Sequence, residues 1–174
     1  WVSHCFDRCC AAGCVLGAKV AVAALTRPTF ERCHFRKSRR HGFVVSSGRP
    51  WVSHCTLSDN ANCGAVFDDV GASGVLRRCT IARNGTQGVF VRSGRGGGAP
   101  PLVLRCDVVD GGASGIKAAR PRGRKAHQFN AGNASGGAID VCECRFFANP
   151  DHDIDVETEA KCTAVANRFC GGRA

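Results

Sequence analysis

Five cysteines of this chain are each followed, nine residues later, by a residue that opens a short apolar segment. The five pairs are Cys33 and Gly42, Cys55 and Gly64, Cys79 and Gly88, Cys106 and Gly115, and Cys144 and Asp153. Around each pair the sequence follows one template, apolar-x-x-Cys-x-apolar, a polar turn, and Gly-apolar-x-apolar. A repeat of this kind predicts a solenoid, in which stacked repeats bury a core that no single repeat could bury.

The alternation within each repeat predicts short β-strands. Apolar residues flank one polar residue at the cysteine, as in Cys79 and Ile81, and again flank one residue after the glycine, as in Val89 and Val91. This period of two is typical of strands, whose successive side chains point to opposite faces. We expect the chain to bend five residues after each cysteine, because Asn and Gly tolerate left-handed backbone. The residues at this position are Ser38, Asn60, Asn84, Gly111 and Asn149.

The interval between successive cysteines of the five grows along the chain, from the shortest at Cys33 to Cys55 to the longest at Cys106 to Cys144. Cys5 begins the series before Cys33, and Asn167 continues it after Cys144. On these positions the chain resembles the right-handed parallel β-helix proteins, the pectate-lyase-like group with short parallel β-helix repeats. The resemblance implies one all-β domain over residues 1–174, a right-handed parallel β-helix of about six to seven coils.

Leucine-rich repeats are the alternative solenoid. The segment 76–84 fits their strand consensus, but the chain contains only six leucines. The apolar alternation after each glycine also has no counterpart in the helical half of a leucine-rich repeat. The β-helix is therefore favoured.

The chain contains 13 cysteines, and at least five share the inward position of successive repeats. Cysteine is a small and readily buried side chain, so we expect a ladder of reduced thiols in the core. A zinc site is the alternative, at Cys9, Cys10 and Cys14 or at Cys142 and Cys144, but neither group has a second pair at finger-like spacing. We therefore expect no metal and no cofactor. The odd number of cysteines and the lack of a signal peptide favour a reducing compartment, intracellular or within a viral particle, over secretion.

The absence of Met and the start at a Trp inside a repeated phrase suggest a piece of a longer protein. No membrane span is expected, because the apolar stretch 11–25 is too short for one and contains Lys19.

The net charge of +10 favours an anionic partner, such as an acidic polysaccharide or a nucleic-acid backbone. The stretch from each glycine to the next cysteine varies in length, so the basic insertions at 93–101 and 119–137 project from one edge, where solenoids commonly bind partners. Aromatic residues do not alternate with the basic residues, so the bases of a nucleic acid would have no side chains to stack on, and sequence-specific binding of nucleic acid is disfavoured. A solvated basic loop is the alternative interpretation. The candidate binding residues on these insertions are Arg95, Arg120, Arg122, Arg124 and Lys125.

A second candidate binding surface is the outer face of the strands that follow the glycines. Its outward positions are Val44, Val66, Phe90, Lys117 and Asp155. Three consecutive apolar residues predict a stripe that faces a partner, a packed loop or another domain. The alternative is the ordinary preference of strands for β-branched residues.

The candidate catalytic residues, if the chain is an enzyme, are Asp68, Asp69, Asp155 and Glu157. The resemblance implies hydrolases that use paired Asp as acid and base, and lyases that use acidic calcium ligands with a basic proton abstractor. We expect Asp68 and Glu157 in one column, about 19 Å apart at about 4.8 Å per coil. This separation exceeds the one that a glycosidase uses.

These observations predict a structural or protein-interaction scaffold that uses the variable-loop edge and the outward apolar stripe, with other protein chains or domains as partners. The alternative is a carbohydrate-active enzyme, a polysaccharide lyase or glycoside hydrolase, acting on an acidic polysaccharide. A basic module for nucleic acid or another polyanion is the third interpretation. The separation of the carboxylates favours the scaffold over the enzyme.

Overall fold

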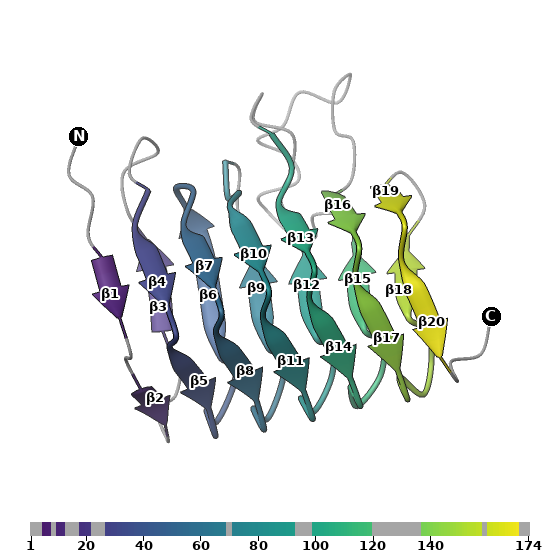
Figure 1. Cartoon of the computed structure of the whole chain (residues 1–174), viewed down its shortest axis with the longest axis horizontal. Coiled ribbons are helices and arrows are strands. Elements are labelled where there is room, and N and C mark those ends of the chain that lie inside the picture. Colours follow the sequence, from purple (N-terminus) through teal and green to yellow (C-terminus); the bar gives the residue numbers. More distant parts are fainter. Residues whose placement is uncertain are drawn as a thin grey trace, which may run out of the picture.

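The protein is a solenoid of three parallel β-sheets, A, B and C (Figure 1). The computed structural model describes residues 5–7, 10–12, 18–21, 27–68, 71–92, 99–119, 137–157 and 160–170, with side chains from residue 27 onward. Each coil contributes one strand to sheet A, the next to sheet B and the third to sheet C. In Figure 1 the strands of sheet A lie above those of sheet B, and sheet C lies behind them.

The strands are short, and each sheet takes every third strand along the chain. Sheet A comprises β1 (Cys5–Asp7), β4 (Thr29–Glu31), β7 (Trp51–Ser53), β10 (Val75–Arg77), β13 (Leu102–Leu104), β16 (Ala138–Cys142) and β19 (Lys161–Val165). Sheet B comprises β2 (Cys10–Ala12), β5 (His34–Arg36), β8 (Thr56–Ser58), β11 (Thr80–Ala82), β14 (Asp107–Val109), β17 (Arg145–Phe147) and β20 (Arg168–Cys170). Sheet C comprises β3 (Ala18–Ala21), β6 (Phe43–Ser47), β9 (Ala65–Phe67), β12 (Val89–Val91), β15 (Ile116–Ala118) and β18 (Ile154–Val156).

The register follows the repeat, so the predicted all-β solenoid is confirmed. Ile81 of β11, for example, lies opposite Leu57 of the preceding coil and Val108 of the following coil. Six coils supply three strands each, and β19 and β20 belong to a seventh. A strand of sheet C occupies the place where a leucine-rich repeat has its helix. Within the described ranges no helix has the length and apolarity that a membrane span requires.

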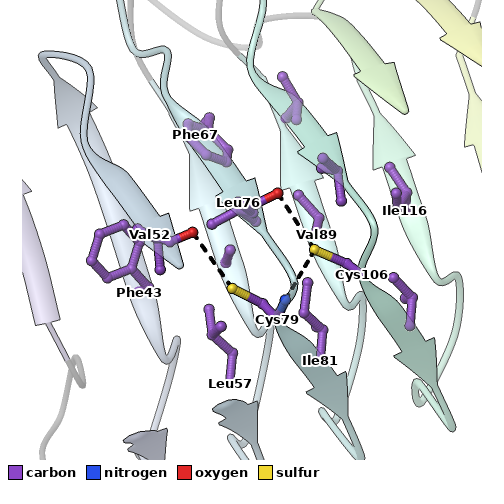
Figure 2. Packing of buried hydrophobic residues seen from close by; sticks show 14 of the residues in the cluster. Phe43, Val52, Leu57, Phe67, Leu76, Cys79, Ile81, Val89, Cys106 and Ile116 are labelled. Carbon is purple, nitrogen blue, oxygen red and sulfur yellow. Dashed lines mark hydrogen bonds between the residues drawn. The ribbon is translucent and has the colours of Figure 1, made fainter. Parts of the chain in front are cut away.

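The core is the space between the three sheets, filled by side chains that stack in columns along the solenoid (Figure 2). In one coil it receives Leu76 from sheet A, Ile81 from sheet B and Val89 from sheet C, all fully buried. The expected thiol ladder is present, because the cysteines of the repeat are buried and form no disulfide. These are Cys33, Cys55, Cys79, Cys106 and Cys144.

Left-handed residues turn the chain at two corners of each coil. At the corner between sheets A and B they directly precede the repeat cysteine or Asn167, and they are Arg32, His54, Arg78, Arg105, Glu143 and Ala166. At the corner after sheet B they are Lys37, Asp59, Arg83, Asp110 and Ala148. The expectation that Asn84 is itself left-handed is therefore wrong, because the preceding Arg83 takes that conformation with φ 51°. The bend is where the sequence predicts it, but shifted by one residue.

The asparagine of the second corner hydrogen-bonds between coils instead of bending the chain. Asn84 donates from Nδ2 to the carbonyl oxygen of Leu57 at 3.0 Å. Its Oδ1 accepts hydrogen bonds from Nδ2 and from the backbone N–H of Asn60, at 2.9 and 3.3 Å. Asn60, Asn84 and Asn149 are all buried. Burial of these amides is possible because their polar atoms are paired.

The cysteine of the first corner makes the same two kinds of bond more weakly. The Cys79 thiol donates to the carbonyl oxygen of Val52 at 3.6 Å, and the Cys106 sulfur accepts from the Cys79 N–H at 3.4 Å (Figure 2). Asn167 replaces the cysteine in the last coil. It donates to the Val141 carbonyl oxygen at 3.0 Å and accepts from the Cys144 N–H at 2.9 Å.

Glycine directly precedes most strands of sheet C because the backbones of neighbouring coils approach closely at this position. A Cβ added at Gly88 would lie 2.6 Å from the carbonyl oxygen of Gly115. Asp153 ends this column, and no described strand of sheet C follows β18. Its side chain therefore has room, and its Oδ1 accepts a hydrogen bond from Asn149 Nδ2 at 2.8 Å.

Candidate functional site

The outer face of sheet C carries the column that the sequence predicts. Val44, Val66, Phe90, Lys117 and Asp155 lie opposite one another on successive strands. The apolar members are not an uncovered stripe, however. Val44 is 9% exposed and Val66 4%, and they form a small cluster with Cys63, against which Phe90 packs. Phe90 alone of the three is only half-buried.

The charged residues of this face are engaged with one another. Lys117 Nζ lies 2.7 Å from Asp155 Oδ2 and 3.3 Å from Glu157 Oε1. The hydrogen bond to Asp155, together with the nearby Glu157, raises the pKa of Lys117. A lysine held in its charged form is a poor proton acceptor, so this cluster is suited to holding charge and not to abstracting a proton.

Asp68 forms a second ion pair on the same face. Its Oδ1 lies 2.6 Å from Nη2 and 2.7 Å from Nε of Arg92, and the Arg92 guanidinium also stands 5.7 Å from the centre of the Phe90 ring. The carboxylate of Asp68 is therefore a hydrogen-bond acceptor for an arginine within the same sheet. The Arg92 guanidinium thus contacts both the Asp68 carboxylate and the Phe90 ring.

The two carboxylates that the sequence places in one column are far apart. Asp68 and Glu157 each follow a strand of sheet C, and the register runs from β9 through β12 and β15 to β18. This path is three strand spacings, about 14 Å at about 4.8 Å each. The expected separation of about 19 Å counts one spacing of about 4.8 Å too many. The distance still exceeds the roughly 6.5–9.5 Å that an inverting glycosidase uses, so the two do not form an acid–base pair.

Cys63 and His41 form a cysteine–histidine contact at the edge of sheet C. His41 Nδ1 accepts a hydrogen bond from the backbone N–H of Cys63 at 3.4 Å, so this nitrogen faces main chain. The Cys63 sulfur lies 3.3 Å from Thr86 Oγ1 and 3.4 Å from Gln87 Oε1. Burial raises the pKa of the Cys63 thiol, which disfavours the thiolate that a nucleophile requires. The contact is structural.

Several predicted site residues fall outside the part of the chain that the structure describes. They are Asp69, Arg95, Arg120, Arg122, Arg124 and Lys125. Of the cysteines considered for zinc, Cys144 belongs to the core ladder, and Cys142 is only half-buried on the outer face of β16. Among the described residues, no group of three or more His, Cys, Asp or Glu side chains is arranged to hold a metal ion.

The outer face of sheet A carries a partly exposed apolar stripe that the sequence did not lead us to expect. Trp51, Val75 and Leu102 lie opposite one another on β7, β10 and β13. Trp51 is 41% exposed, and Val75 and Leu102 are half-buried. Leu104 stands in the adjacent column beside Arg77. The sequence signal for this stripe is the apolar residue four positions before the repeat cysteine in these coils. It is easily overlooked because an inward apolar residue follows it directly.

Comparison with known proteins agrees with the fold. A family model described as the right-handed beta helix region matches residues 3–123, more than half of the chain. Among solved structures, the A-module of the mannuronan C-5 epimerase AlgE4 from Azotobacter vinelandii is similar over 99% of this chain and 56% of its own length, with a TM-score of 0.61 and 13% identity. The chain thus spans little more than half of that module, and the likeness shows the fold alone. No curated protein matches the sequence.

Proposed function

We propose that this chain, which belongs to the right-handed β-helix family, is a protein-interaction scaffold that binds its partner on the outer face of sheet A. The observation that carries the proposal is the partly exposed stripe of Trp51, Val75 and Leu102, held in register on three neighbouring strands. A partner that covers such an apolar stripe removes it from water, which stabilises the complex. Tryptophan and arginine, here Trp51 and Arg77, are the side chains most enriched at the energetic centres of interfaces.

The partner is a different protein with an apolar patch bordered by carboxylates. A second copy of the chain would fit the apolar stripe equally well, but each copy has a net charge of +10, and two such copies repel one another. An acidic partner is attracted by the same charge. Arg77, beside Leu104 in the column next to the stripe, gives this partner's carboxylates a bidentate donor.

The experiment places a photoreactive amino acid at Val75 or Leu102, with Thr56 on the outer face of sheet B as the control position. In cells of the source organism, the sheet A positions should trap one common protein and the control position should not. That protein, identified by mass spectrometry and purified, should bind the wild-type chain. It should bind the Trp51→Asp variant at least about tenfold more weakly, and the Thr56→Asp variant with unchanged affinity.

Three outcomes would refute this proposal. They are equal trapping at Thr56, trapping of the chain by itself, and a purified partner whose affinity is the same for the Trp51→Asp variant. Trp51 is 41% exposed, so the rest of its side chain packs on the sheet and Trp51→Asp should lower the melting temperature. Binding is therefore measured at a temperature at which circular dichroism shows the variant to be fully folded, so that a loss of binding does not reflect unfolding.

An enzyme that acts on an acidic polysaccharide is the second candidate function. It is favoured by the likeness to a module whose name is that of a mannuronan epimerase, and by the net positive charge. Asp68, Lys117 and Glu157 already form ion pairs within the chain, and this favours the scaffold over the enzyme. Incubation with mannuronan and polygalacturonate, followed by proton NMR of the polymer, separates the two. Turnover that is abolished by Asp68→Asn or Glu157→Gln, in variants that remain folded, would replace the scaffold with the enzyme.

A further inference from the structure

The thiol ladder is the column of repeat cysteines at the corner between sheets A and B. Its members occupy equivalent positions of successive coils and are at most 2% exposed: Cys33, Cys55, Cys79, Cys106 and Cys144. Figure 2 shows two neighbours, Cys79 and Cys106, whose side chains point the same way. Neighbouring sulfurs of the ladder are therefore about one strand spacing apart, about 4.8 Å.

Hydrogen bonds to the backbone hold the sulfurs in this arrangement. Cys106 Sγ accepts from the N–H of Cys79 at 3.4 Å and donates to the carbonyl oxygen of Leu76 at 3.4 Å. Cys144 Sγ repeats both contacts one coil later, with the N–H of Cys106 and the carbonyl oxygen of Val103, each at 3.4 Å. Because the contacts recur, the direction and the spacing of the sulfurs recur with them.

Neighbouring thiols also change each other's ionisation. Hydrogen bonds from the Cys106 and Cys55 thiols lower the pKa of Cys79, although burial opposes them. The pKa of Cys106 changes in the opposite direction, because its hydrogen bonds with Cys144 and Cys79 raise it. Neighbouring sulfurs thus share a proton, and a cation that binds two sulfurs at once can take the place of that proton.

The spacing of the sulfurs matches one kind of metal coordination. A metal–thiolate bond is about 2.3 Å long, so a metal ion in line between two sulfurs spans about 4.6 Å. This length is within about 0.2 Å of the strand spacing. Soft Cu(I) prefers thiolate ligands and accepts two of them in a line. Zinc requires four ligands in a tetrahedron, which a single column of sulfurs does not supply.

Charge balance and access also fit a monovalent ion. When Cu(I) binds two thiols, one thiol loses its proton to solvent, so the core stays neutral and no uncompensated charge is buried. A groove of about 620 Å³ runs along the outside of the same corner. It is lined by Cys79 and Cys144, and by Arg78 and Thr80 on either side of Cys79. The groove therefore gives a metal ion a path from solvent to the ladder.

We propose that neighbouring sulfurs of the thiol ladder bind a soft monovalent metal ion of the Cu(I) class in a linear, two-coordinate site. The sequence-based expectation of no metal rested on the spacing of tetrahedral zinc ligands, and it does not bear on a site with two ligands. The ladder is also separate from the stripe at Trp51, so this inference and the proposed scaffold function can fail independently.

The test compares two triple variants that keep the same number of ladder thiols. The separated variant carries Cys33→Ala, Cys79→Ala and Cys144→Ala, and its remaining Cys55 and Cys106 are two strand spacings apart, about 9.6 Å. The adjacent variant carries Cys33→Ala, Cys55→Ala and Cys144→Ala, and its remaining Cys79 and Cys106 are neighbours. Cysteines outside the ladder are identical in the two variants, so their contribution to binding is the same.

Cu(I) affinity is measured without oxygen, with ascorbate as the reductant and a coloured Cu(I) chelator as the competitor. The adjacent variant should bind Cu(I) at least about tenfold more tightly than the separated variant. Circular dichroism at the same temperature checks that both variants are folded. A second measurement needs no variant: X-ray absorption of the wild-type chain with one equivalent of Cu(I) should show two sulfur neighbours.

Three results would overturn the inference. The first is no binding of Cu(I) by the wild-type chain. The second is equal affinity of the separated and adjacent variants, which would assign the metal to cysteines outside the ladder. The third is a copper ion in the wild-type chain with three or more ligands, which the spacing of the ladder does not allow.

Discussion

The substitution Asn84→Ala tests the hydrogen bonds that join one coil to the next. Asn84 is 1% exposed, and two donors of Asn60, its backbone N–H and one Nδ2–H, use the Asn84 Oδ1 as acceptor. Removing that acceptor leaves both donors buried without it. At about 1–3 kcal/mol for each unsatisfied buried group, the loss is about 2–6 kcal/mol. Water entering the cavity left by the amide would reduce this, so we expect about 3 kcal/mol.

The assay is equilibrium unfolding in urea, followed by circular dichroism, with Asn62→Ala as the matched control. Asn62 lies in the equivalent turn of the preceding coil, two residues after Asn60, and is only half-buried, and its hydrogen bonds to neighbouring coils come from the backbone. The control should therefore change the free energy of unfolding by no more than about 0.5 kcal/mol. A loss below about 1 kcal/mol for Asn84→Ala, or equal losses for the two variants, would refute the coupling role of the buried amide.

Three further predictions follow from the corners and from the edge of sheet C. Cys79→Asp should lower the free energy of unfolding by several kcal/mol because it buries an unpaired carboxylate, whereas Cys79→Ala should lower it by only about 1 kcal/mol. A disulfide at Cys79, detected by peptide mapping, would contradict the assignment of Cys79 as a buried free thiol. Ala148 is exposed with φ 51°, so Ala148→Gly should raise the melting temperature and Ala148→Val should lower it by the equivalent of about 1–2 kcal/mol, and the reverse order would exclude corner strain. Burial and then Arg40 lower the pKa of His41, although Asp68 opposes them. Because the folded state then binds a proton at His41 less readily than the unfolded state, the stability contributed by neutral His41 should be complete above about pH 6.5. The free energy of unfolding should decrease as the pH falls below that value, and His41→Gln should weaken this dependence on pH.

The repeat predicts the fold because the same few positions face inward in every coil. The spacing from Cys79 to Gly88 fixes one strand in sheet B and one in sheet C, and the stacking of identical units sets the register. The backbone of the corners was less accessible to prediction. Arg78, Arg83 and Asp110 are left-handed without being glycine, and the stack imposes a conformation for which their residue types show only a weak preference or none.

The surfaces were harder to predict than the core for two physical reasons. Val66 points outward as expected, but its exposure depends on side chains that cover it, Cys63 from the same coil and Phe90 from the next coil. In sheet A the outward Val75 directly precedes the inward Leu76, and Leu102 precedes Val103. Two consecutive apolar residues are typical of a strand buried on both faces, so the sequence did not distinguish the outward residues of the stripe from the inward residues beside them.

The nearest-neighbour stacking of the coils has a mechanical consequence. Each coil is bonded only to the coil before it and the coil after it, so tension on the two ends of the chain should detach whole coils in succession. The length released in each event should follow the intervals between the repeat cysteines, the shortest from Cys33 to Cys55 and the longest from Cys106 to Cys144. At about 3.4 Å per extended residue these events span about 75 to about 130 Å, with the longest from the coil that contains the insertion at 119–137. The chain would therefore act as a tether that is stiff up to a threshold force and then lengthens in unequal steps.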